Sequence, residues 1–438
     1  MASSIKYELF WRMNVSLLSH RAIFKRGISS IVIKVIGALL AFSMNVIVAR
    51  TVSIDAAGYF FLSVTLVALI STVSRYGFDS VLVKNVAAAE NAEQQNTIFT
   101  ISLMVSISLC IALSVLFYFS THIISGLLKI SDDFLGLVGI IALAIPFFTI
   151  NFMASLFYQG KKNNDVAMFL QNVVIPLLFL LPVLIFVPTT TLTLMWVYLL
   201  ACLLSFFIAL LYSYKYLQLP VFSNTKNLKK VTHGCSELLI VQLLIIFGAC
   251  FGQIMLSLWH SAESVAVYTI AQKITFFCGF FVYAFNSVMA PLFAEAFRDN
   301  DINRVMRDGQ WITRILMVIS IPLIFFVAFF APEILQIFGE EYKKGAYALR
   351  IFCLAQIVNV MTAPVNTILQ MLGYESALRK NFVISAGLCI LVGIILIPTF
   401  GVNGAAFTSA LYMVLVHILS MYKVRSLFGF YTFGLSRN

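Results

Sequence analysis

Long apolar runs separated by short polar segments make up most of the chain. About twelve runs can be distinguished, and most contain close to twenty residues or more. Because an α-helix rises about 1.5 Å per residue, about twenty residues cross the ~30 Å hydrocarbon core of a bilayer. The pattern therefore predicts an all-α membrane protein with about twelve transmembrane helices. The runs lie at 28–50, 57–78, 97–119, 134–158, 167–187, 192–214, 238–258, 265–293, 311–330, 346–372, 382–398 and 404–422.

The first run carries a single charge, Lys34, within the sequence ISSIVIKVIGALLAFSMNVIVA. A cation in the middle of a spanning helix costs roughly 2.5–3.5 kcal/mol on insertion scales. We expect the face that carries Lys34 to point toward other helices or a wet cavity, although the long lysine stem can also carry the ammonium to the headgroups. At helical spacing, small or polar residues share that face: Gly27, Ser30, Ala38, Ala41 and Asn45.

Composition and charge support the membrane assignment and set the orientation. Hydrophobic residues make up 61% of the 438 positions and charged residues 11%, against about 25% charged in soluble domains. The formal net charge is +11, and the basic residues lie mainly in every second loop, which indicates cytoplasmic loops and argues against a nucleic-acid surface. We therefore expect both termini in the cytoplasm. The predicted outer loops contain few basic residues: Arg50, Lys129, Lys343 and Lys344.

The two halves of the chain resemble each other at a shift of about 210 positions. In one ungapped register Asp55 aligns with Glu263, Asn45 with Gln253, and Lys34 with Gln242. Six helices per copy is an even number, so the copies have the same orientation and an axis along the membrane normal. We expect an N-lobe at 1–216, a cytoplasmic linker at 217–237 and a C-lobe at 238–438.

Charged and amide side chains inside the runs are the candidates for function. Lys273 lies about two turns inside the eighth run, in YTIAQKITFF, and Lys34 lies near the cytoplasmic end of the first. Two buried cations that face one space repel each other unless an anion joins them. We therefore predict a cationic cavity for an anionic ligand. The amides expected to line it are Asn45, Gln242 and Gln253.

The few acidic residues near helix ends have two interpretations each. Arg75 and Asp79 are spaced i, i+4 and form either a local ion pair or part of a gate. Glu237 opens the seventh run, where a carboxylate suits the positive end of the helix dipole, or it takes part in ion coupling. Arg50 ends the first run and is expected to anchor it at the outer interface.

Catalytic and metal-binding signals are missing from the sequence. The seven cysteines lie mostly inside apolar runs without metal-ligand spacing, and no nucleotide-binding, nucleophile or metalloprotease motif is found. The five histidines are scattered, and only His417 lies inside a helix where a proton relay merits a test. We expect no cofactor, no metal and no enzymatic activity.

Three segments resemble Wzx-type flippases: VARTVSIDAAGYFF, RYGFDSVLVKNVA and IPTFGVNGAAFTSALYMVL. Wzx-type flippases form the polysaccharide-exporter branch of a superfamily that includes the multidrug and toxin extruders and the lipid II flippases. The resemblance implies a V-shaped, MATE-like fold of two six-helix lobes in a bacterial inner membrane. It also implies export of undecaprenyl-pyrophosphate-linked oligosaccharide, for O-antigen or capsule, to the periplasmic leaflet by alternating access. By helix position, Lys34, Arg75 and Lys273 would correspond to cavity-facing basic residues of the related flippases.

The same resemblance implies a polysaccharide polymerase and a chain-length regulator as partners, and no nucleic acid. It leaves the coupling ion, Na⁺ or H⁺, open, because only Asp79 and Glu237 are candidates for coupling. Two alternatives remain at this point. A cation-coupled antiporter of drugs or metabolites requires buried carboxylates, and a membrane polymerase requires a large outer loop with catalytic Arg or His.

Overall fold

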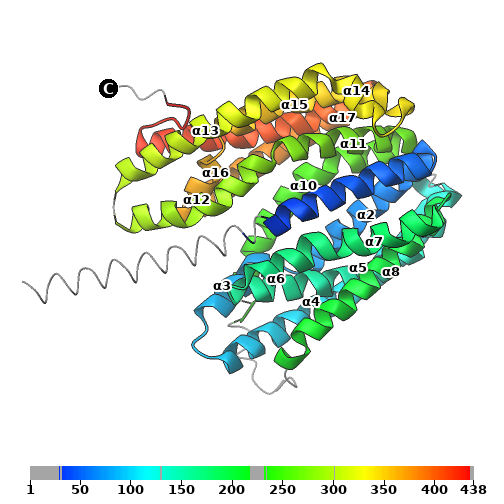
Figure 1. Cartoon of the computed structure of the whole chain (residues 1–438), viewed down its shortest axis with the longest axis horizontal. Helices are drawn as coiled ribbons and strands as arrows, with labels where there is room; N and C mark the ends of the chain where they lie inside the picture. Colours follow the sequence, from blue (N-terminus) through cyan, green and yellow to red (C-terminus); the bar gives the residue numbers. More distant parts are fainter. Residues whose placement is uncertain are drawn as a thin grey trace, which may run out of the picture.

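The computed structural model describes residues 29, 32–128, 131–217, 231–232, 234–299 and 301–434, which are almost entirely helical. Figure 1 shows two helical bundles side by side, which we call the N-lobe and the C-lobe. The predicted linker 217–237 falls mostly outside the described residues.

The N-lobe is built around α5, which packs against α2, α3, α4 and α8. Its core consists of large apolar side chains such as Phe60, Phe157 and Phe179, all completely shielded from solvent. Its elements are the first helix Val32–Thr51, α2 Ile54–Ser74, α3 Phe78–Ala88, α4 Ala92–Leu128, α5 Asp132–Gly160, α6 Asn164–Met168, the π-helical turn η1 Phe169–Val173, α7 Val174–Phe186, α8 Thr191–Ser213 and the 3₁₀ turn η2 Tyr214–Tyr216.

The C-lobe is built around α17, which packs against α10, α15 and α16. The helix predicted at 265–293 is broken at Gly279, and the helix predicted at 346–372 is broken around Thr362. Its elements are α10 Cys235–Trp259, α11 Ala262–Cys278, α12 Phe280–Arg298, α13 Ile302–Phe329, α14 Ala331–Gln336, the 3₁₀ turn η3 Glu340–Gly345, α15 Ala346–Met361, α16 Val365–Met371 and α17 Glu375–Phe428.

The 54 residues of α17 are two helices joined at Gly401, which has non-helical backbone angles of φ 53° and ψ −126°. The two halves run antiparallel, because the Asn381 amide donates to the Ser420 hydroxyl (3.2 Å) and the Cys389 thiol contacts the Thr408 carbonyl (3.5 Å). A positive φ suits glycine, which has no Cβ to clash. The last two predicted runs are therefore the arms of this hairpin.

Each predicted run coincides with helical structure. Among the described residues, nine helices are long and apolar enough to cross a membrane, or up to ten if the pair bent by 47° around residues 362–364 is one span. One of these nine is α17, which contains two predicted runs, and the shorter α11 and α12 together cover the eighth run. Of the three spans by which nine differs from twelve, two come from the breaks in the eighth and tenth runs and one from the union of two runs in α17.

The lobes meet along a seam formed by the first helix, α2, α10 and α11. Helix α2 lies so close to α11 that a Cβ at Gly58 would come 1.9 Å from the Ala262 carbonyl oxygen. We call this end of the molecule, from Arg50 to Asp55 and from His260 to Glu263, the closed end. Toward the opposite end α12 diverges from α3 in Figure 1, while the start of α10 stays in contact with the α2–α3 turn.

Candidate functional site

Two hydrogen bonds across the seam are images of each other under the internal repeat. The Lys273 ammonium donates to Asn45 Oδ1 (2.6 Å), and the Thr65 hydroxyl donates to Gln253 Oε1 (2.8 Å). The same shift of 208 positions relates Asn45 to Gln253 and Thr65 to Lys273. We call the first the charged seam bond and the second the neutral seam bond. Reciprocal pairs of this kind are what a two-fold interface produces.

A third contact locates the pseudo-two-fold axis at the closed end. The backbone N–H of Glu263 donates to Asp55 Oδ1 at 2.9 Å, and these two acidic residues are themselves separated by 208 positions. The preceding serines, Ser53 and Ser261, both cap their helices by accepting a bond from a backbone N–H. The duplicated register predicted from the sequence is therefore retained in the local geometry of α2 and α11.

Lys273 has few partners for an ammonium inside a spanning segment. Besides Asn45 Oδ1, its Nζ lies 4.8 Å from the centroid of the Phe61 ring, and it forms no ion pair with any carboxylate in the described ranges. The Asn45 side chain is held with its Oδ1 toward Lys273, because its Nδ2 donates to the Ala41 carbonyl at 2.7 Å. The ammonium is thus held by neutral groups, and its charge is not compensated.

The neutral seam bond leaves a donor unused. Gln253 is 2% exposed, and its Nε2 has no hydrogen-bond partner within the part of the chain that is described. A buried amide donor without a partner costs about 1–3 kcal/mol. The seam therefore presents one uncompensated cation and one unsatisfied donor, both suited to an oxygen-rich anionic ligand.

Lys34 and Gln242 occupy equivalent positions on the first helix and α10, and both are half-buried. Neither forms a hydrogen bond or ion pair with another described residue. Lys34 precedes Asn45 by eleven residues, which corresponds to roughly 16 Å along the helix axis. Lys34 therefore lies about three helical turns from the residue that Lys273 contacts, at a different depth of the seam.

Arg75 lies inside the N-lobe and is 3% exposed. Its Nε donates to Asp79 Oδ1 (2.9 Å), its Nη1 and Nη2 donate to the hydroxyls of Ser71 (2.7 Å) and Thr72 (3.0 Å), and its guanidinium lies 4.1 Å above the Phe152 ring. Asp79 Oδ2 is buried and has no hydrogen-bond partner among the described residues. The i, i+4 ion pair is present, and the contacts of Arg75 are with N-lobe residues. Glu237 falls in the first turn of α10, and its side chain lies outside the described residues.

Thr65 is a site residue that the sequence alone did not reveal. A threonine in an apolar helix normally bonds a carbonyl of its own helix, as Thr72 does with Ala68. Thr65 instead donates across the seam to Gln253. The internal repeat aligns Thr65 with Lys273, and this alignment is the sequence signal that could have identified Thr65.

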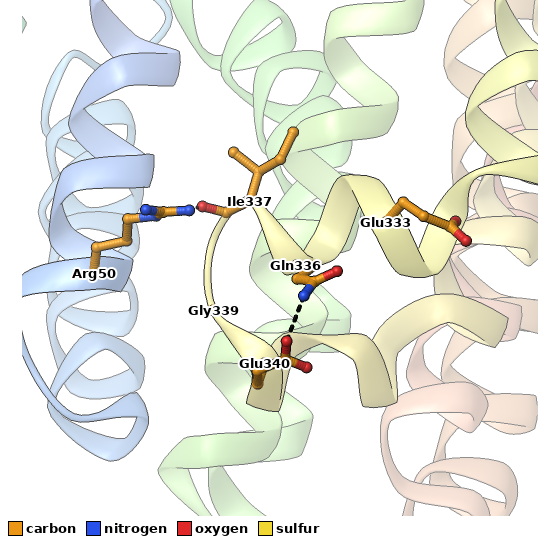
Figure 2. Close-up of a pocket in the computed structure, with 6 residues that line it drawn as sticks. All are labelled: Arg50, Glu333, Gln336, Ile337, Gly339 and Glu340. Carbon is orange, nitrogen blue, oxygen red and sulfur yellow. Dashed lines mark hydrogen bonds between the residues drawn. The ribbon is translucent and has the colours of Figure 1, made fainter.

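Arg50 forms a second link between the lobes at the closed end. Its Nε donates to the Ile337 carbonyl at 2.6 Å, directly after the last turn of α14, where a cation suits the negative end of the helix. Figure 2 shows Arg50 reaching from the N-lobe toward the α14–η3 segment, which supplies the rest of a pocket of about 490 Å³. The pocket is lined by Arg50, Glu333, Gln336, Ile337, Gly339 and Glu340.

Two models of known protein families match the chain. A family model described as "Polysaccharide biosynthesis protein" matches residues 23–297, which is more than half of the chain. The chain belongs to this family. A second model, MatE, matches residues 238–399 in the C-lobe. The resemblance drawn from the sequence is thereby confirmed at the level of the family.

A curated relative agrees with the family assignment. The probable low-salt glycan biosynthesis flippase Agl15 of Haloferax volcanii is 26% identical over 158 residues, which cover 36% of this chain and 34% of that protein. The chain thus matches about a third of the length of this curated relative.

Solved structures share the fold at low sequence identity. The lipid II flippase MurJ in an inward closed conformation has a TM-score of 0.74 at 14% identity, covering 91% of this chain and 87% of that one. An inward-facing multidrug resistance MATE family transporter of the MOP superfamily has a TM-score of 0.73 at 14% identity, covering 92% and 98%. The predicted all-α, MATE-like membrane fold is confirmed.

Proposed function

We propose that this polysaccharide biosynthesis family protein is a flippase that moves a lipid-linked glycan across the membrane, with the anionic head of the lipid held at the seam. The observation that carries the proposal is the Lys273 ammonium, which lies between the lobes and is held by an amide and a ring but by no described carboxylate. Activity then consists of transport, without a catalytic step. The specific substrate that we propose is undecaprenyl-pyrophosphate-linked oligosaccharide of the O-antigen or capsule type.

The orientation of the protein in the membrane follows from the distribution of charge. We place the closed end on the periplasmic side of a bacterial inner membrane and both termini in the cytoplasm. The described basic residues near the closed end are few, namely Arg50, Lys343 and Lys344, whereas the opposite end carries many more. Lysine and arginine in short loops mark the cytoplasmic side.

Lys34 and Lys273 would act in sequence, because they lie at different depths of the seam. Lys34 is near the cytoplasmic end and would attract the pyrophosphate first, and Lys273 would hold it deeper between the lobes. Sugar hydroxyls lose their water inside hydrocarbon at a cost of several kcal/mol each unless new partners replace it. The amides of Gln242 and Gln253 are the seam groups suited to replace it, while the polyprenyl tail stays in lipid.

A cation-coupled antiporter of small molecules is supported less well. It requires a carboxylate that is free to exchange a cation, and one oxygen of Asp79 is already paired with Arg75. Whether Na⁺ or H⁺ drives transport is a separate matter, for which a liposome assay with imposed gradients would be informative. A polymerase and a chain-length regulator remain proposed partners on the periplasmic side.

Complementation tests the proposal directly. In a strain that lacks its own flippase, we expect Lys273→Met to reduce surface polysaccharide at least about tenfold, because about 1.4 kcal/mol of lost binding suffices. Lys273→Arg should retain most of the activity, and Lys84→Met, at an exposed lysine of α3, serves as the matched control. Normal surface polysaccharide in well-expressed Lys34→Met and Lys273→Met variants would show that the cationic seam is not the substrate site.

A further inference from the structure

The two seam bonds are geometrically equivalent but differ in charge. Lys273 contacts the N-lobe twice, through the Asn45 amide oxygen and the Phe61 ring, whereas its repeat equivalent Thr65 makes one uncharged bond to Gln253. The other hydrogen bonds found between the described parts of the lobes, from Arg50 and to Asp55, lie at the closed end. Of the two seam bonds, only the charged one therefore offers an incoming anion a cation to attract.

Competition between acceptors decides which partner Lys273 takes. An amide oxygen is a neutral acceptor, so the Lys273 ammonium gains from it only one charge-assisted hydrogen bond, whereas a phosphate oxygen adds the Coulomb attraction of a negative charge. The low dielectric between packed helices increases the preference for the anion. A phosphate oxygen that reaches Lys273 will therefore displace Asn45 Oδ1, and the N-lobe loses its charged contact with α11.

We propose that the charged seam bond is a ligand-sensitive tie between the lobes, and that an anionic lipid head which captures Lys273 breaks it and so favours separation of the lobes at the closed end. The inference rests on the proposed function and adds the regulation of the same site. Without a ligand the bond holds the closed end together, so an empty transporter stays closed there. A single anion suffices, because the repeat places the charge in only one of the two bonds.

The neutral seam bond has a different part in this scheme. Neither Thr65 nor Gln253 changes its charge, so an anion does not compete for their mutual bond as strongly. The unused Gln253 Nε2 can donate to the ligand while Oε1 keeps its bond to Thr65. Removal of the neutral bond should therefore weaken closure without changing how closure responds to an anion.

The experiment measures lobe separation in the full-length protein in lipid nanodiscs. Spin labels are placed at Thr189 in the N-lobe and Tyr347 in the C-lobe, both exposed and outside the seam helices. The seven cysteines are buried, so cysteines introduced at these positions react preferentially. The probes are undecaprenyl pyrophosphate and, as the uncharged control, undecaprenol. Probe binding is measured in parallel by retention on the immobilised protein.

We expect undecaprenyl pyrophosphate, but not undecaprenol, to lengthen the distance between the labels in the wild type. Asn45→Asp replaces the amide acceptor with a carboxylate and should raise the probe concentration required by about tenfold. Asn45→Ala should lengthen the distance without any probe. Thr65→Val, at the neutral bond, should shift the midpoint of the probe response less than Asn45→Asp does, and Lys84→Met, at an exposed lysine outside the seam, should leave it within about twofold of the wild type.

Separate outcomes overturn the tie and the flippase proposal. If the pyrophosphate probe binds but the distance stays constant, the tie is wrong and the flippase proposal stands. Equal midpoint shifts in Asn45→Asp and Thr65→Val would also overturn the tie, because the charge would then have no special role. If the wild type binds neither the pyrophosphate probe nor its glycan-bearing form, both proposals fail.

Discussion

Arg75 and Lys273 are both cations inside the helical core, and the structure treats them in opposite ways. Arg75 donates to a carboxylate and two hydroxyls and stacks over a ring, all within the N-lobe. Lys273 reaches from one lobe to the other and meets one amide and one ring. A buried charge whose partners are all in place stabilises a fold, whereas one with missing partners and a position between moving parts can exchange them for a ligand.

The largest expected effect is on the fold, from Arg75→Met. The change leaves Asp79 buried without its cation, which typically costs about 3–5 kcal/mol in the free energy of unfolding. Unfolding in mixed micelles with increasing SDS, followed by tryptophan fluorescence, measures this loss. Replacement of both partners with Leu should recover most of the stability, because well-packed apolar residues often substitute for a buried pair. A stable Arg75→Met protein that fails only in transport would assign Arg75 to the ligand site instead.

A smaller loss of stability is expected where the seam is tightest. A Cβ at Gly58 would lie 1.9 Å from the Ala262 carbonyl oxygen, so Gly58→Ala forces α2 and α11 apart at a cost of about 1–3 kcal/mol. The charged seam bond depends on the same approach and should weaken with it. Gly136→Ala in α5 is the matched control, since no atom lies within 4 Å of the added carbon and alanine favours the helix by up to about 1 kcal/mol. Equal stability of the two variants would show that the close contact at Gly58 does not limit the seam.

Lys273→Met should change stability by less than about 1 kcal/mol, in contrast to Arg75→Met. The variant loses a charge-assisted hydrogen bond worth about 1.5–3 kcal/mol, but it also removes a cation whose insertion costs about 2.5–3.5 kcal/mol. The two contributions nearly cancel. The same SDS titration checks the value, and a loss as large as that of Arg75→Met would mean that Lys273 has a structural role.

The hydrophobic pattern was sufficient to locate the helical segments, because a spanning helix needs about twenty apolar residues, but it did not reveal the breaks at Gly279 and around Thr362. The repeat register was sufficient to relate Asn45 to Gln253, and burial inside a helix singled out Lys273. The partners of each cation could not be predicted in the same way. Phe152 reaches Arg75 only after α2 and α5 have packed, and the depth of Lys34 relative to Lys273 follows only once Asn45 is known to meet Lys273.

The most selective prediction moves the cation across the pseudo-two-fold axis. Lys273→Thr alone should reduce transport at least about tenfold, as Lys273→Met does, and adding Thr65→Lys should raise it several-fold above that level, because the new ammonium faces Gln253 Oε1 in the equivalent geometry. Recovery should stay partial, since Thr269 occupies the position equivalent to Phe61 and offers no ring. The control combines Lys273→Thr with Ala68→Lys, which places the charge one turn further along α2. The readout is surface polysaccharide normalised to the amount of protein. If the control recovers as much as the swap, any cation near the seam suffices, and the symmetry of the two bonds has no functional meaning.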